Sequence, residues 1–242
     1  MQRNPDFNWL FYVARETGLS PCVAFRASRY VSQLSSERSG RRIVSQCNRL
    51  FFDIKKGRST QKSFISPFVS HCLFISIKIE TQEWLSNPRI MDFALQNHFS
   101  VSHYTDPVKL SSILMEADLM ISTAMNWRII PLSPFQCLED LFESKCVKYM
   151  NYAIELCTDA VVYEIDVPCA RTLACAAVVA AETLHGKQCH ASSRALNCFV
   201  LLSVAPSAFD AVDYSAVVSL SEELEDLHVK INKGKRKRFF SN

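Results

Sequence analysis

The residues best suited to chemistry in this chain of 242 residues form one short cluster of histidine and cysteine. His185, Cys189 and His190 lie close together in the sequence, and side chains of these types can hold a transition metal. Their spacing matches no standard zinc pattern, and no two of the 10 cysteines are separated as in a CxxC motif. A single histidine is also common at the exit of a helix. The sequence therefore predicts no metal site and no cofactor.

Sequence signatures of enzymes are missing as well. There is no HExxH, GxSxG or kinase catalytic-loop motif. The 5 glycines stand far apart, so no glycine-rich loop can surround a phosphate. We therefore expect a protein that is not an enzyme.

The elements that position the remaining polar residues are predicted to be helices. Six prolines follow Asn, Ser or Asp, as in Ser20-Pro21 and Ser133-Pro134. An oxygen-bearing N-cap followed by proline is typical of a helix start. Each pair precedes apolar residues at helical spacing, and no useful alternation of period two occurs. The sequence predicts an all-α protein with helices at residues 5–17, 21–34, 67–80, 88–98, 107–125, 134–142, 147–157, 169–184 and 215–229.

The hydrophobic segments and the cysteines in them indicate the cellular compartment of the protein. Cys72, Cys157 and Cys175 stand inside apolar stretches, where free cysteine acts as a small hydrophobic side chain. The longest apolar run, residues 173–181, is far shorter than the about 20 residues that span a bilayer. The N-terminal residues lack the apolar core of a signal peptide. We expect reduced thiols, no membrane partner, and a location in the nucleus and cytoplasm.

The net charge of +3 is distributed unevenly along the sequence. Residues 35–62 and residues 230–238 each carry +6, so the remaining residues carry −9. A short helix at residues 43–54 fits the apolar pattern of the first basic segment. The length of that segment favours a loop, with a partner-binding element as the alternative.

The helices resemble those of the cyclin family in four segments that occur in the family's order. WLFYVARETGLSPCVAFRASRYVSQL and FVSHCLFISIKIET look like the first three helices of a cyclin box. DLMISTAMNWRIIPLSPFQCLEDLF resembles the fifth helix, its exit at Met125-x-Trp127 and the Ser-Pro that opens a second repeat. YAIELCTDAVVYEIDVPCARTLACAAVVAAE resembles helices two and three of that repeat.

The resemblance implies two tandem five-helix repeats, the second divergent or incomplete. The repeats would occupy residues 1–131, including the basic insert 35–62, and residues 132–230, with a basic tail at 231–242. The implied function is that of a regulatory subunit that binds and activates a cyclin-dependent serine/threonine kinase in cell-cycle control. The alternative is a cyclin-fold, transcription-associated protein that binds other proteins or nucleic acid.

The family's kinase contacts can be carried over onto a few positions of this chain. Lys78 matches a lysine at the end of the third helix, and Ile79 follows it as an apolar contact. The family's acid on the fifth helix falls on Asp118 when counted back from Trp127, with Glu116 as the second choice. Outside this resemblance, the three charged residues would be ordinary solvated helix residues.

The basic tail has two interpretations of its own. Lys233, Lys235, Arg236, Lys237 and Arg238 resemble a nuclear import signal, with an import receptor as partner. A solubilising, disordered tail is the alternative. Nucleic acid is not expected as a partner of the chain, and the tail in particular is so short a run that it neutralises few phosphates.

Overall fold

In the part of the chain that the computed structural model describes, all regular secondary structure is helical and no strand occurs. That part comprises residues 2–52, 65–80, 107–127, 132–143, 149–167, 169–185 and 212–239. The all-α prediction is confirmed for these residues. The expected helix at 88–98 lies outside them.

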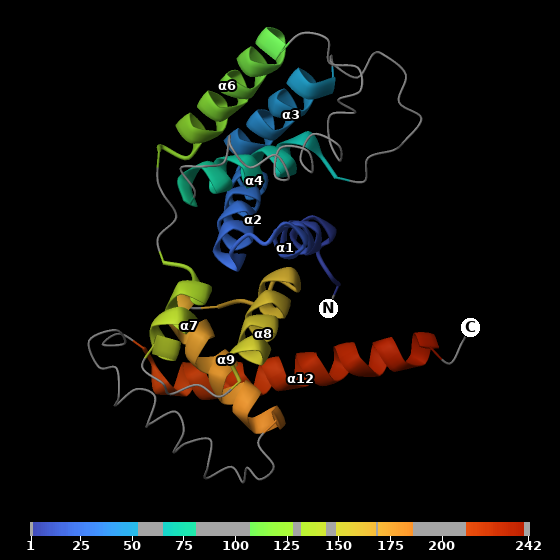
Figure 1. Cartoon of the computed structure of the whole chain (residues 1–242), viewed down its shortest axis with the longest axis vertical. Helices are drawn as coiled ribbons and strands as arrows, with labels where there is room; N and C mark the ends of the chain where they lie inside the picture. Colours follow the sequence, from blue (N-terminus) through green and yellow to red (C-terminus); the bar gives the residue numbers. More distant parts are fainter. Residues whose placement is uncertain are drawn as a thin grey trace. The chain divides into compact units, whose positions relative to one another are not determined.

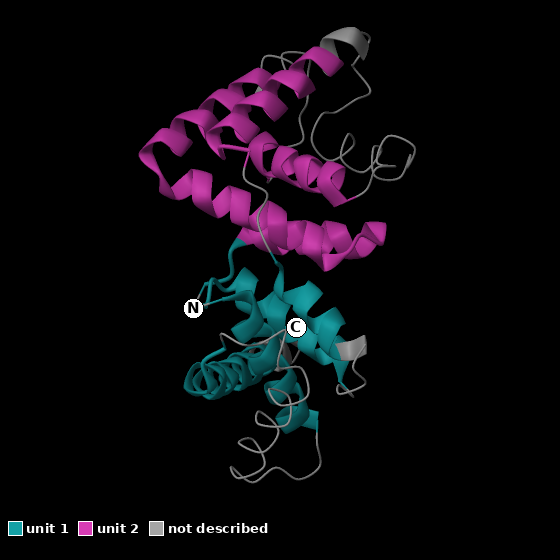
Figure 2. Cartoon of the chain, turned by 90° about the vertical axis from the view of Figure 1, so that its left-hand side faces the viewer, with its two compact units in different colours: residues 1–4, 132–242 teal, residues 5–131 magenta. Residues whose placement is uncertain are grey.

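The chain divides into two compact units (Figure 2). Unit 2 is Pro5–Pro131, and unit 1 combines Met1–Asn4 with Leu132–Asn242. The helices of unit 2 are α1 (Pro5–Thr17), α2 (Pro21–Ser36), α3 (Arg38–Phe52), α4 (Pro67–Glu80) and α6 (Pro107–Ala124) (Figure 1). Those of unit 1 are α7 (Pro134–Glu143), α8 (Met150–Val162), α9 (Ala170–His185) and α12 (Tyr214–Phe239).

The turn between α1 and α2 shows how the predicted caps act. Gly18 has a φ of +71° and ends α1, because glycine adopts this left-handed conformation without a steric cost. The Ser20 side chain accepts a hydrogen bond from the Cys22 amide at 3.2 Å, and Pro21 takes the first helical position. The end of α1, the start of α2 and the break between them are therefore fixed by local sequence.

Helix α4 is the central helix of unit 2. Residues 68–77 are buried without interruption, and α1, α2, α3 and α6 all contact this helix. Full burial of one large apolar side chain contributes about 1.5–3 kcal/mol. Phe68, Phe74 and Ile77 are among the most completely buried large side chains, so α4 anchors the hydrophobic core of the unit.

The first half of the basic insert forms a helix, so the expectation of a loop is wrong there. Helix α3 buries Cys47 and Phe51 against the unit and packs on α2, α4 and α6. A Cβ on Gly40 would lie 2.2 Å from the Leu34 carbonyl oxygen, so only glycine permits this approach to α2. The Asn48 side chain accepts a hydrogen bond from the Phe68 amide at 3.0 Å and so caps α4. Residues 53–62 lie outside the described part.

Unit 1 is built around α9. Residues 172–181 of α9 are all buried, as expected of a helix that is apolar nearly all round. Helices α7, α8 and α12 contact it, and α12 lies across both α9 and α8 (Figure 1). Helix α7 begins with a reciprocal cap: Gln136 accepts from the Ser133 amide at 3.0 Å, and Ser133 accepts from the Gln136 amide at 3.2 Å.

Helix α12 continues to Phe239, ten residues beyond the predicted end at Val229. The basic tail residues 233–238 are therefore helical rather than a separate disordered segment. The acidic residues Glu222, Glu223, Glu225 and Asp226 lie in the first half of the same helix. Among the described helices, none is long and apolar enough to cross a membrane.

The cysteines behave as the sequence predicts where they are described. Cys72, Cys157 and Cys175 are buried, and all seven cysteines of the described part are free thiols. Burial raises the pKa of the Cys47 and Cys137 thiols to about 12. These thiols stay protonated at neutral pH, so they serve as small core side chains.

Candidate partner-binding groove

An open apolar groove lies within unit 2, between the C-terminal part of α4 and the outer side of α6. Its volume is about 1230 Å³. Met115 and Leu119, one helical turn apart on α6, are 67% and 58% exposed. Ile79 at the end of α4 is also exposed. A contiguous exposed patch of large apolar side chains is typical of a surface that binds another protein.

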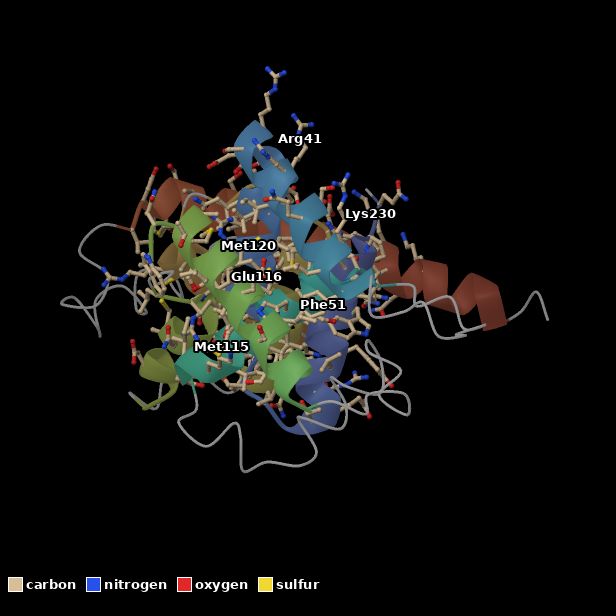
Figure 3. The ribbon with its side chains drawn as sticks, turned by 90° about the horizontal axis from the view of Figure 1, so that it is seen from above. Arg41, Phe51, Met115, Glu116, Met120 and Lys230 are labelled. Carbon is tan, nitrogen blue, oxygen red and sulfur yellow. The ribbon has the colours of Figure 1, made fainter. Side chains whose placement is uncertain are left out.

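The four predicted contact residues all line this groove. Lys78 and Ile79 come from the last turn of α4, and Glu116 and Asp118 come from the middle of α6. Met115 and Glu116 can be followed along α6 in Figure 3. The fold therefore brings together two segments that are about forty residues apart in the sequence.

Lys78 and Asp118 form an ion pair on one side of the groove. The Lys78 ammonium donates to Oδ2 of Asp118, and both side chains are about one-quarter exposed. Glu116 is exposed and forms no ion pair among the described residues. Of the two acids considered from the sequence, Asp118 is the one that contacts Lys78.

His71 holds the other oxygen of the same carboxylate, and the sequence analysis overlooked it. Its side chain is 0% exposed, and Nε2 lies 2.9 Å from Oδ1 of Asp118. The ring packs near Phe51 and Phe74, with centroid distances of 5.5 Å and 6.2 Å. Nδ1 is buried and has no hydrogen-bond partner among the residues that the structure describes. His71 is thus a polar group placed inside the core of unit 2 to reach one carboxylate.

The protonation states in this cluster follow from burial and hydrogen bonding. Burial lowers the pKa of His71, and this outweighs the hydrogen bond and charge of Asp118, so the ring is neutral. A carboxylate only accepts hydrogen bonds, which assigns the single ring proton to Nε2. Burial acts to raise the pKa of Asp118, but hydrogen bonds from His71 and Lys78 hold it below its usual value. Asp118 is therefore a carboxylate with both oxygens engaged.

A sequence signal for His71 does exist. It is seven residues before Lys78 in an otherwise apolar helix, which places both on the same face two turns apart. A lone histidine in a buried helix is usually a satisfied core residue. Only the fold shows that its partner is the carboxylate that also binds Lys78.

The end of α4 is fixed by a second charged contact. Arg26 of α2 is buried, and its guanidinium pairs with Glu80 at 3.0 Å and donates to the Ser76 carbonyl at 3.3 Å. Positive groups near a helix C-terminus satisfy its free carbonyls and its negative dipole end. Arg26 therefore holds the turn that presents Lys78 and Ile79.

The exit of α6 supplies a further apolar side chain to the groove. Asn126 and Trp127 have φ values of 51° and 55°, a conformation that costs residues with a side chain about 1 kcal/mol or more. The Trp127 amide donates to the Ser122 carbonyl at 2.8 Å, which closes the helix end. The Trp127 side chain is 67% exposed and lines the groove.

The other residues considered from the sequence do not form a site in the described part. His185 stacks on Tyr152 with a centroid distance of 3.5 Å, while Cys189 and His190 lie outside the described residues. No cluster of three metal-binding side chains occurs among the residues that are described. Lys233 and the four basic residues after it belong to α12, and only Lys233 has a described side chain.

Comparisons with known proteins identify no relative. The chain matches no protein-family model, no curated protein and no solved structure.

Proposed function

We propose that this chain is a cyclin-like regulatory subunit that binds and activates a cyclin-dependent serine/threonine kinase through the groove between α4 and α6. The observation that carries the proposal is the convergence of Lys78, Ile79 and Asp118 on one open apolar surface. These three residues were selected because two separate segments of the sequence resemble helices of the cyclin family. The proposal includes two tandem helical repeats, of which the first carries the groove.

The proposed mechanism is binding rather than chemistry. A protein kinase is active when its αC helix is held inward, so that a lysine–glutamate ion pair can grip ATP. A rigid partner that binds only the inward arrangement shifts the population toward it. In this chain the binding energy would come from apolar side chains such as Met115 and Leu119, which are exposed in the unbound protein.

The ion pair of Lys78 and Asp118 would fix the position of the docked kinase αC helix along the groove. Both groups keep some exposure, so they can exchange a mutual hydrogen bond for one to the kinase backbone. Such an exchange costs little because hydrogen bonds are replaced rather than lost. The His71 hydrogen bond keeps the Asp118 carboxylate in place while this happens.

The test is kinase co-purification with single variants of the full chain. Leu119→Asp puts a charge into the apolar surface and should reduce kinase binding at least tenfold. Lys78→Glu should do the same, because it places a carboxylate beside Asp118. Lys230→Glu, an identical substitution at an exposed position of α12, is the matched control and should bind as the unmodified chain does.

Two readouts separate loss of binding from loss of folding. Circular dichroism and the melting temperature of Leu119→Asp should stay close to those of the unmodified chain, since the residue is exposed. Recovery of the same kinase at full yield with both Leu119→Asp and Lys78→Glu would contradict the proposal.

The basic residues 233–238 are proposed to bind an import receptor, which would distribute the protein between nucleus and cytoplasm. Six basic residues and no acid in positions 230–238 support this. Replacing Lys233, Lys235, Arg236, Lys237 and Arg238 by Gln should remove nuclear accumulation of a fluorescent fusion. Kinase binding should not change, because the groove belongs to the other unit.

A further inference from the structure

The outer face of α3 has an unusual composition. Its exposed side chains are four arginines, two serines and one glutamine, with no acidic and no apolar residue among them. These are the side-chain types that donate hydrogen bonds to phosphate oxygens. The exposed set is Arg38, Ser39, Arg41, Arg42, Ser45, Gln46 and Arg49.

The arginines are aligned along the helix. Arg38, Arg42 and Arg49, together with Ser45, follow one another at spacings of three or four residues, which keeps them on one face. At 1.5 Å per residue the row is about 16 Å long. Arg41 stands beside this row and projects away from the helix (Figure 3). The charges therefore form a continuous strip.

Within the described part of the chain, these guanidinium groups are not neutralised by acidic side chains. No acidic side chain of the described residues forms an ion pair with Arg38, Arg41, Arg42 or Arg49. The Glu37 side chain, just before the helix, hydrogen-bonds Ser39 instead. Four like charges on one face repel one another by Coulomb's law, so an anionic partner that covers them would be favoured.

The strip is held on a rigid support. The opposite face of α3 buries Cys47 and Phe51, and Gly40 allows the helix to touch the backbone of α2 at Leu34. The Asn48 cap ties α3 to the start of α4. A helix fixed in this way presents its charges without the cost of ordering its backbone on binding.

We propose that the strip formed by Arg38, Arg41, Arg42 and Arg49 binds the phosphate backbone of a nucleic acid duplex without reading its sequence. Guanidinium groups match phosphate oxygens in geometry as well as charge. A surface that recognises an acidic polypeptide normally includes an apolar or aromatic anchor, and the exposed face of α3 has none. Phosphate contacts need no such anchor. This inference does not depend on the kinase proposal, since the groove uses other residues.

The experiment is fluorescence anisotropy of a labelled random-sequence DNA duplex with the full chain at 50 to 200 mM salt. The logarithm of affinity falls with the logarithm of salt concentration by about 0.9 for each phosphate neutralised. Replacing the four arginines by Gln should make this slope less steep by about 3.6. In the unmodified chain, the contribution of the four arginines to DNA affinity should therefore weaken by about 100-fold between 50 and 200 mM salt.

Three matched proteins sharpen the result. Replacing the same four arginines by Lys keeps the charge and should keep the slope. Replacing the five basic tail residues at 233–238 by Gln should leave the 3.6 contribution of the α3 arginines intact. Lys78→Glu should bind DNA as the unmodified chain does, which separates this surface from the groove.

The outcomes that would overturn the proposal are specific. One is an unchanged slope in the four-Gln protein, with all binding lost in the tail variant. Another is binding of labelled poly-glutamate to the α3 face in preference to DNA. Circular dichroism excludes misfolding as the cause, because the four side chains are exposed and their loss should leave the helical signal unchanged.

Discussion

Helices α4 and α9 are both buried over ten consecutive residues, yet they are built for different tasks. The buried stretch of α9 is almost entirely Ala, Val and Cys, and small side chains let α8 and α12 pack against it. The buried stretch of α4 includes Ser70, His71 and Ser76, and His71 extends its ring to a carboxylate on α6. A polar group in a core costs free energy unless it is satisfied, so its presence in α4 indicates a purpose other than packing.

The difference continues at the helix ends. The last turn of α4 carries Lys78 and Glu80, each held by a charged partner from another helix. Exposed apolar side chains lie directly beside this turn, along α6. The last turn of α9 carries His185, which stacks on Tyr152 within its own unit. The comparison shows that α9 completes a core, whereas α4 both completes a core and presents charges to a groove.

The largest effect is expected when a charge enters the small-residue core of α9. Ala176→Arg buries an unpaired guanidinium and should lower the free energy of unfolding by about 4–5 kcal/mol or more. Amide hydrogen exchange should report loss of protection in α7, α8, α9 and α12. Glu155→Arg, at an exposed position of α8, is the control and should change stability by no more than about 0.5 kcal/mol. Full protection of α9 in the Ala176 variant would show that its packing is not as close as described.

An intermediate effect is expected when the Asp118 carboxylate, which contacts both His71 and Lys78 of α4, is removed. Asp118→Ala leaves the buried Nε2–H of His71 without an acceptor and Lys78 without its partner, which should cost about 2 kcal/mol. Asp118→Asn retains an oxygen for His71 and should cost less. Chemical denaturation measures both. Glu116→Ala, two residues away and exposed, should be near neutral. Equal losses for the Asp118→Ala and Glu116→Ala variants would remove the reason for singling out Asp118.

The smallest effect is a dependence of stability on pH that arises from His71 in α4. The pKa of His71 is lowered below its usual 6.5 in the folded protein, so the unfolded chain binds more protons as the pH falls through that value. Stability should therefore decrease from pH 7 to pH 5. His71→Gln keeps a donor for Asp118 but does not titrate. Between pH 7 and pH 5, the melting temperature of this variant should therefore fall by about 2–4 °C less than that of the unmodified chain.

A second pH window belongs to the carboxylate itself. The pKa of Asp118 is lowered below its usual 3.8, so its contribution is present above that value and is lost as the pH falls below it. The loss linked to His71 begins near pH 6.5 and the loss linked to Asp118 begins near pH 3.8, so thermal melts can distinguish the two onsets. An identical pH profile for His71→Gln and the unmodified chain between pH 7 and 5 would contradict the neutral, buried state of His71.

Local patterns predicted most helix boundaries because the forces that set them are local. Ser20-Pro21 and Ser133-Pro134 supply a cap and a preset φ within two residues, and α1, α2 and α7 each begin at a proline. Helices α1 and α4 begin and end at the predicted residues. Helix α3 was predicted only in part, as a short helix at residues 43–54, because its charged face hides a narrow apolar stripe and its stability comes from packing on α2, α4 and α6. The extension of α12 was missed because a run of like charges argues against a helix.

Residue types and register along each helix determined the all-α class and the burial of α9, because the spacing of apolar residues is contained in the sequence in full. The choice of Lys78 and Asp118 rested instead on the resemblance to the cyclin family. Only the tertiary structure decided that Lys78, Asp118 and His71 meet, that Trp127 joins their groove, and that the α3 arginines share one free face. Contacts across about forty residues depend on how helices pack. That packing is set by the summed burial of the whole core and by close approaches such as that of Gly40 to Leu34, which no local pattern records.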